Sequence, residues 1–173
     1  MTKSNFVHLV TGAAGFIGSA LIIALLKKGE TVVGIDNLNN YYDQSLKKAR
    51  ISNINKFAES NSGKWIFYKC DLNDLCELKN IGKRHEIKVI VNLAAQAGVR
   101  FSIDNPSAYV NSNLVGFANI LELCRQLDVE NFIYASSSSV YGGNKELPFK
   151  ENQNVDSPIS FYAATKKSNE LMA

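Results

Sequence analysis

Long apolar stretches, cysteine pairs and clusters of like charge are scarce or missing in this 173-residue sequence. No apolar run reaches the roughly 20 residues that a membrane-spanning helix needs, so we expect no membrane partner. Lysine and arginine are scattered and the formal net charge is only +3, which argues against a nucleic-acid partner. Histidine is also rare, with two residues far apart in the chain, so we expect no metal site.

The few cysteines indicate the cellular compartment. Cys70, Cys76 and Cys124 form no Cys-x-x-Cys pair, and an odd, unclustered set is typical of reduced thiols. The start of the chain, Met1 to Asn5, leads directly into a short apolar run without the features of a signal peptide. Both observations predict a cytoplasmic protein.

Short apolar runs alternate with segments whose apolar residues recur at helical spacing. This alternation predicts an α/β fold in one domain over residues 1–173, with a doubly wound parallel sheet and helices on both faces. We expect the chain to end inside its last helix, as the front part of a longer protein, because no cap or proline follows it. The expected strands are 6–10, 31–36, 65–70, 89–93 and 132–135, and the expected helices are 16–28, 43–57, 73–85, 105–127 and 162–173.

A glycine-rich turn, Thr11 to Gly18, joins the first expected strand to the first expected helix. Gly12 would permit the tight turn, Gly15 would let the backbone approach a pyrophosphate, and Gly18 would let the helix pack on the sheet. N–H groups at a helix start attract phosphate charge. The spacing is a variant of the usual dinucleotide motif, and the context predicts a Rossmann domain that binds NAD(H); the alternative is a turn that only shapes the fold. Neighbouring residues expected at the cofactor are Ala14, Phe16 and Ile17.

Two acidic residues follow expected strands and suit the adenosine half of the cofactor. Asp36 ends the second strand, near the usual offset of about 20 residues, where a carboxylate can accept hydrogen bonds from both ribose hydroxyls. It would repel a 2′-phosphate, and Asn37 follows it rather than arginine, so we expect NAD rather than NADP. Asp71 can bind the adenine amino group, with Leu72 against the ring; its alternative role is to cap the next helix.

A serine cluster and a Tyr-x-x-x-Lys pair predict a reaction site. Ser136 to Ser139 follow the fifth expected strand, and ligands of open parallel sheets bind at the carboxyl ends of strands. Tyr162 and Lys166 share one helix face, where an ammonium group favours the phenolate form of a nearby phenol. A phenolate can act as general base on an alcohol, with Ser137 as its hydroxyl partner.

With these residues, the chain resembles the extended short-chain dehydrogenase/reductases, the NAD-dependent epimerase/dehydratase family, and is most similar to its UDP-glucuronate 4-epimerase branch. The resemblance covers essentially the whole chain. It is carried by residues 11–18, 36–43, 93–100, 135–142 and 162–173.

The resemblance implies roles for single residues. Ser137 would orient the sugar 4-hydroxyl, Tyr162 would be the base, and Lys166 would tune Tyr162 and bind the cofactor ribose. Asn113 would support the active site, and Arg100 and Ser138 would contact substrate. Further cofactor contacts implied are Leu93, Ala94, Ala95, Gln96, Asn113, Ser136 and Tyr162.

The implied activity is 4-epimerisation of a nucleotide sugar, UDP-glucuronate to UDP-galacturonate, through a transient 4-keto sugar. Related dehydratases carry an Asp-Glu pair where this chain has Ser138 and Ser139, and related decarboxylases keep the Glu, so elimination lacks its acid/base pair here. A decarboxylase, a dehydratase and an inactive NAD-binding fragment remain alternatives. The resemblance also implies a UDP-sugar substrate, a homodimer and polysaccharide biosynthesis. Because its C-terminal substrate-binding part would be missing, the chain alone should bind NAD weakly and turn over little.

Overall fold

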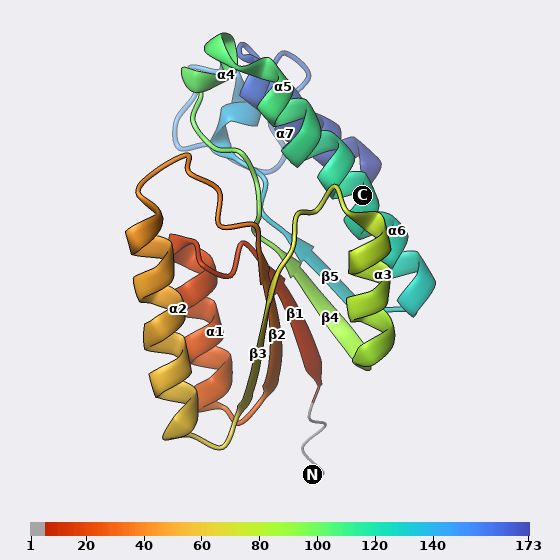
Figure 1. Cartoon of the computed structure of the whole chain (residues 1–173). Helices are drawn as coiled ribbons and strands as arrows, with labels where there is room; N and C mark the ends of the chain where they lie inside the picture. Colours follow the sequence, from red (N-terminus) through yellow and green to blue (C-terminus); the bar gives the residue numbers. More distant parts are fainter. Residues whose placement is uncertain (1–5) are drawn as a thin grey trace.

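Five parallel strands form one sheet in the computed structural model, which describes residues 6–173 (Figure 1). The strand order is β3-β2-β1-β4-β5, so β1 lies at the centre. The first five residues, on which the expectation about a signal peptide depends, lie outside the described part. The strands are β1 (Val7–Thr11), β2 (Thr31–Asp36), β3 (Lys64–Lys69), β4 (Ile87–Asn92) and β5 (Asn131–Tyr134).

Helices cover both faces of the sheet, which confirms the doubly wound fold. In Figure 1, α1 (Phe16–Lys27) and α2 (Gln44–Glu59) lie on one face, and α3 (Leu75–Arg84) and α6 (Gly116–Leu127) lie on the other. The remaining helices gather beyond the carboxyl ends of the strands. They are α4 (Phe101–Asp104), α5 (Pro106–Tyr109), the π-helical turn Val110–Val115, the 3-10 turn Ser138–Tyr141 and α7 (Phe161–Met172).

Alternation along the central strand builds two cores. Leu9 is fully buried and belongs to the cluster that holds Ile120 of α6. Its neighbour Val10 is equally buried but points the other way, into the cluster of Ile22 and Ile54 from α1 and α2. Burying each such side chain contributes about 1.5–3 kcal/mol, so the two helical layers hold the sheet rigid from both sides.

The single helix expected over 105–127 is confirmed, with one wider turn inside it. Asn105 caps it and Pro106 lies in its first turn, and α5, the π-helical turn Val110–Val115 and α6 follow one another without a break up to Leu127. The short helix α4 was not anticipated. The wider π turn brings the buried polar residue Asn113 into hydrogen-bond reach of two other segments, and such insertions often mark functional sites.

The other elements agree with the sequence to within about two residues at each end, which is the usual uncertainty of helix limits. Asp43 caps α2, as expected, by accepting from the backbone N–H of Ser45. The cap of α3 is Asp74 rather than Asp71, which leaves Asp71 free for another role. No helix within residues 6–173 combines the length and apolar character needed to cross a bilayer.

Two glycines of the turn pack so closely against backbone atoms that neither can carry a side chain. Gly12 has φ +67°, and a Cβ on it would lie 2.9 Å from the backbone nitrogen of Ala94. A Cβ on Gly18 would lie 2.2 Å from the carbonyl oxygen of Gly12. Both neighbours are backbone atoms, which cannot move without displacing a strand end or the helix. The turn therefore brings the ends of β1 and β4 and the start of α1 together.

Gly18→Ala should lower the free energy of unfolding by about 1–3 kcal/mol, the usual cost of overpacking a rigid site. Gly143→Ala is the matched control, because a Cβ there meets nothing within 4 Å. Urea unfolding followed by circular dichroism measures both variants. Equal stability of the two variants would show that α1 can move away from the turn without cost.

Candidate functional site

A cavity of about 430 Å³ opens at the carboxyl ends of β1, β2, β3 and β4. Its walls come from the glycine turn, the loops after β2 and β3, and the segment after β4. Eleven of the expected cofactor residues line it, namely Gly12, Gly15, Phe16, Asp36, Asn37, Asp71, Leu72, Leu93, Ala94, Ala95 and Gln96. The cavity is therefore where the sequence places a dinucleotide.

The start of α1 faces this cavity with unsatisfied backbone donors. Gly15 is the N-cap residue and no side chain caps the helix, so the first-turn N–H groups are available to an anion. Phe16 is 80% exposed beside them. Ala14 differs from expectation, because it is fully buried and its N–H donates to Asp36 Oδ2 at 3.1 Å. Ile17 and Gly18 do not line the cavity either.

Asp36 is buried and already accepts three hydrogen bonds. Oδ2 accepts from the Ala14 N–H, and Oδ1 accepts from the Leu38 N–H at 2.8 Å and from Lys47 Nζ at 3.4 Å. An ionised carboxylate has about four acceptor positions. These three hydrogen bonds leave one of the four positions open, and the expectation that Asp36 binds the ribose hydroxyls stays a prediction.

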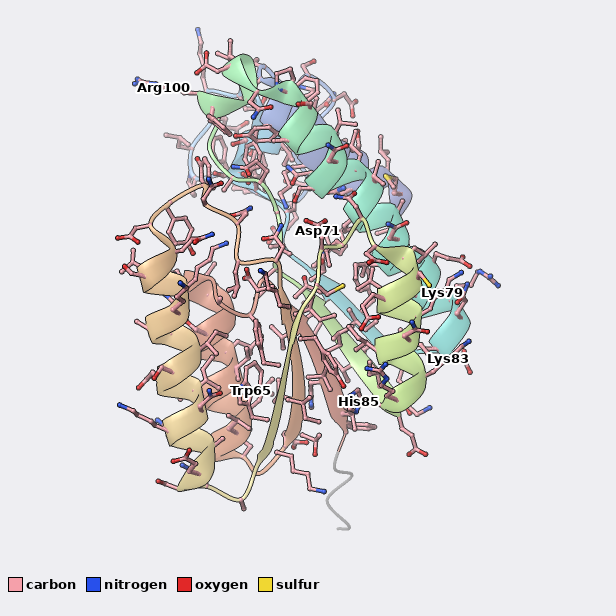
Figure 2. The ribbon with its side chains drawn as sticks, viewed as in Figure 1. Trp65, Asp71, Lys79, Lys83, His85 and Arg100 are labelled. Atoms are coloured by element: carbon pink, nitrogen blue, oxygen red, sulfur yellow. The ribbon has the colours of Figure 1, made fainter. Side chains whose placement is uncertain are left out.

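Asp71 lies at the end of β3, as Figure 2 shows, and its carboxylate is held by amide groups. Burial alone would raise the pKa of Asp71, but hydrogen bonds from Asn37 and Asn73 outweigh that effect and lower the pKa from its ordinary value. The Asn37 side chain donates at 2.8 Å. Asp71 thus stays ionised as an acceptor beside the cavity.

Six residues of α2 and the loop before it line the cavity without having been predicted from the sequence. They are Asn39, Tyr41, Tyr42, Leu46, Lys47 and Arg50. Arg50 Nη1 donates to the carbonyl of Ala14 at 3.2 Å and to the Tyr42 hydroxyl at 3.0 Å. The sequence contains a signal for two of the six. Asp43 is the expected cap of this helix, and Lys47 and Arg50, which are three residues apart, share one face of it.

Asn113 connects the cavity wall to α7. Its side-chain oxygen accepts from the Gln96 N–H at 2.8 Å, and its amide donates to the Gln96 carbonyl and to Thr165 Oγ1, both at 3.1 Å. Asn169 in turn donates to the Asn113 carbonyl at 2.7 Å. Asn113 is 2% exposed and does not line the cavity, so the structure gives it a positioning role rather than a direct contact.

The expected reaction residues lie after β5 and on α7, outside the cavity lining. Lys166 Nζ donates to the carbonyl of Ala135 at 2.8 Å, at the end of β5. Ser137 Oγ accepts from the Ser139 N–H, and the Tyr162 N–H donates to Ser102 Oγ at 3.3 Å. Within residues 6–173, no hydrogen bond joins the side chains of Ser137, Tyr162 and Lys166 to one another.

The remaining expected site residues face solvent. Ser136 is exposed and donates to Glu170 at 2.5 Å, and Ser138 begins the 3-10 turn. Arg100 is exposed and projects outward beside α4 in Figure 2, away from the cavity lining. In the described part of the chain, no group of three histidine, cysteine or acidic residues could hold a metal ion.

Burial lowers the pKa of Lys166 from its ordinary value of 10.5 to about 8. Below pH 8 the folded and unfolded chains both carry the proton, and the folded state bears the full cost of burying the charge. Between about pH 8 and 10.5 the unfolded chain binds more protons, so this group makes unfolding free energy rise with pH.

The free energies of unfolding of the unsubstituted chain and of Lys166→Met are therefore compared. The value for the unsubstituted chain minus the value for the variant should rise by a few kcal/mol between pH 7.5 and 10.5, at about 1.4 kcal/mol for each pH unit. Urea titrations at several pH values measure it. Burial raises the pKa of Cys70 and Cys124 to about 11, which acts in the opposite direction but cancels in the difference. Parallel curves would show that Lys166 keeps its ordinary pKa.

Known proteins are similar to this chain over nearly its whole length. Protein CapI of Staphylococcus aureus is 52% identical over 165 residues, which cover 95% of this chain and 48% of that protein. UDP-glucuronate 4-epimerase 4 of Arabidopsis thaliana is 45% identical over 173 residues, covering 99% of this chain and 38% of that protein. The chain thus spans about half or less of the length of these relatives.

Among solved structures, UDP-glucuronic acid 4-epimerase of Bacillus cereus in complex with UDP-glucuronic acid and NAD superimposes with a TM-score of 0.82 at 37% identity. The superposition covers 96% of this chain and 51% of that one. The family model described as GDP-mannose 4,6 dehydratase matches residues 9–173. The chain therefore belongs to this family of NAD-dependent nucleotide-sugar epimerases and dehydratases.

Proposed function

We propose that this chain is the NAD(H)-binding part of a nucleotide-sugar 4-epimerase that converts UDP-glucuronate to UDP-galacturonate. One observation carries the proposal: Asn113 ties the cavity wall at Gln96 to the helix of Tyr162 and Lys166. A dinucleotide site and a base for alcohol chemistry are thereby held in fixed relation. Similarity to UDP-glucuronate 4-epimerases supports the choice of substrate.

The residues at the cavity fit NAD(H). A Cβ on Gly12 or Gly15 would meet the chain's own backbone, so the tight turn needs both glycines, and the uncapped start of α1 offers N–H donors to a pyrophosphate. Asp36 and Asp71 offer acceptors to the ribose and the adenine amino group. When bound, NAD supplies the reversible hydride acceptor that epimerisation at an alcohol carbon needs.

The chain's own residues would move the proton. Tyr162 would take the proton of the sugar 4-hydroxyl and later return it, and Ser137 would orient that hydroxyl. Lys166 is mostly protonated at neutral pH despite its lowered pKa, so it offers a positive charge one helical turn from Tyr162. Ser138 and Ser139 provide no carboxylate for elimination, which favours epimerisation over dehydration.

The whole protein supplied with UDP-glucuronate and NAD should produce UDP-galacturonate, resolved by chromatography and NMR. Tyr162→Phe should reduce kcat by about 10²–10⁴-fold, because the aromatic ring stays and only the general base is lost. Tyr141→Phe, which removes a phenol from the neighbouring 3-10 turn, is the control and should retain activity. A 4-keto-6-deoxy product or release of carbon dioxide would contradict the proposal.

A further inference from the structure

The phenol of Tyr162 is the proposed base, and hydrogen bonds within residues 6–173 do not fix its direction. In that part of the chain, the polar contacts of Tyr162 are made by its backbone. Its N–H donates to Ser102 Oγ at 3.3 Å, and its carbonyl accepts from Thr165 Oγ1 at 2.8 Å. A general base acts only when its oxygen lies within hydrogen-bond reach of the proton that it takes. The direction of the Tyr162 ring must therefore be set by packing.

Tyr109 of α5 supplies this packing. Its side chain is fully buried, and its ring meets the Tyr162 ring with centroids 6.0 Å apart and planes 73° apart. It also meets the ring of Phe161 at 6.5 Å and 89°. Edge-to-face pairs at such distances are a favoured arrangement of two aromatic rings. A single buried ring thus contacts both residues that begin α7.

Tyr109 is itself anchored to the wall of the cavity. Its hydroxyl donates to the carbonyl of Ala97 at 2.8 Å and also to the carbonyl of Gly98. Ala97 lines the cavity, and Phe101 of α4 packs on the Tyr109 ring with centroids 6.2 Å apart. The side chain therefore connects the cavity wall to the first turn of α7.

Ser102 of α4 holds the backbone at the same place. The N–H groups in the first turn of a helix have no partner inside the helix, and Ser102 Oγ accepts the one from Tyr162. Ser102 is 1% exposed, and its hydroxyl donates to the Val99 carbonyl at 2.6 Å. Figure 1 shows α4 and α5 beside the start of α7, where they contact it. The backbone and the ring of Tyr162 are thus both held by this pair of short helices.

We infer that Tyr109 is a positioning residue for the epimerisation, which directs the Tyr162 phenol through ring contact and is anchored at Ala97 and Gly98. The inference rests on the proposed function, because it requires Tyr162 to act as the base. Contact through the ring leaves the Tyr162 hydroxyl available to a substrate oxygen. Small displacements of a reacting group reduce rates strongly, so the orientation of this ring should affect turnover.

Kinetics of the whole protein with UDP-glucuronate test the inference. Tyr109→Leu removes the ring and should lower kcat about 10–100-fold, because the base is no longer directed at its proton. The KM for UDP-glucuronate and the affinity for NAD+ should stay within about twofold, since a misdirected base still permits binding. Tyr109→Phe keeps the ring and should retain kcat to within about threefold, although its urea midpoint falls as two buried carbonyls lose their donor.

Tyr68→Leu is the matched control. Tyr68 also packs edge-on against a neighbouring ring, that of His85, and its hydroxyl is hydrogen-bonded to the same residue. It lies on β3 and outside the cavity lining. This variant should have a lower urea midpoint and an unchanged kcat, which separates loss of stability from loss of positioning.

The outcomes separate the two proposals. An equal fall of kcat in Tyr109→Phe and Tyr109→Leu would overturn the inference, because ring contact would then not be the cause. Normal kcat in Tyr109→Leu would also overturn it, and UDP-galacturonate formation by the unsubstituted protein would leave the proposed function standing. Absence of UDP-galacturonate from the unsubstituted protein would overturn both.

Should Tyr109→Leu fail to fold, NMR of the unsubstituted chain decides. Nuclear Overhauser effects must then join the rings of Tyr109 and Tyr162, and the Tyr162 side chain must occupy a single χ1 rotamer. Averaging of Tyr162 over several rotamers would overturn the inference.

Discussion

The approach of Gly12 to the segment after β4 is the constraint on which the site depends. At this point, two backbones are so close that a Cβ would lie 2.9 Å from the Ala94 nitrogen. Thr11 strengthens the junction, because its hydroxyl donates to Asn92 at 2.6 Å and accepts from the Ala94 N–H at 3.1 Å. These contacts fix the ends of β1 and β4 side by side, so the glycine turn and the Leu93–Gln96 wall form one rigid surface.

The two ends of the site are built on different principles. The proposed adenosine end contains charged side chains, because the buried Asp36–Lys47 ion pair and the amide-held Asp71 lie there. The reaction end relies on neutral hydrogen bonds, in which Asn113 joins Gln96 to Thr165. Because the π-helical turn carries Asn113, an irregularity in one helix determines where α7 lies relative to the cavity.

The sequence was sufficient for the sheet, the layers and about half of the residues that line the cavity. Strand and helix periodicity is a local property, and the glycine turn and Asp36 are set by their position after particular strands. The π turn inside the helix over 105–127 was not predictable, because the apolar spacing continues through it. That turn is required by Asn113, whose partners Gln96 and Thr165 are distant in sequence.

Lys47 and Ala14, near the proposed adenosine site, are two further residues whose contacts the sequence pattern did not predict. A lysine on an amphipathic helix is ordinarily solvent-exposed, and only the packing of α2 on the glycine turn buries this one. Ala14 belongs to the glycine-rich turn, yet its N–H donates to Asp36 Oδ2 and does not point into the cavity. Arg100, chosen through resemblance, is exposed outside the cavity lining because the segment after Gly98 turns outward into α4.

We propose that the carboxyl edge of this sheet forms a dinucleotide site anchored at Gly12. Titration of the ¹⁵N-labelled chain with NAD+, followed by amide chemical shifts, tests this proposal. The largest shift changes should occur at Gly12–Gly18, Asp36–Asn37 and Leu93–Gln96, with little change at the far end of the sheet near Glu30 and Gly63. Changes confined to other surfaces, or none at millimolar NAD+, would contradict it.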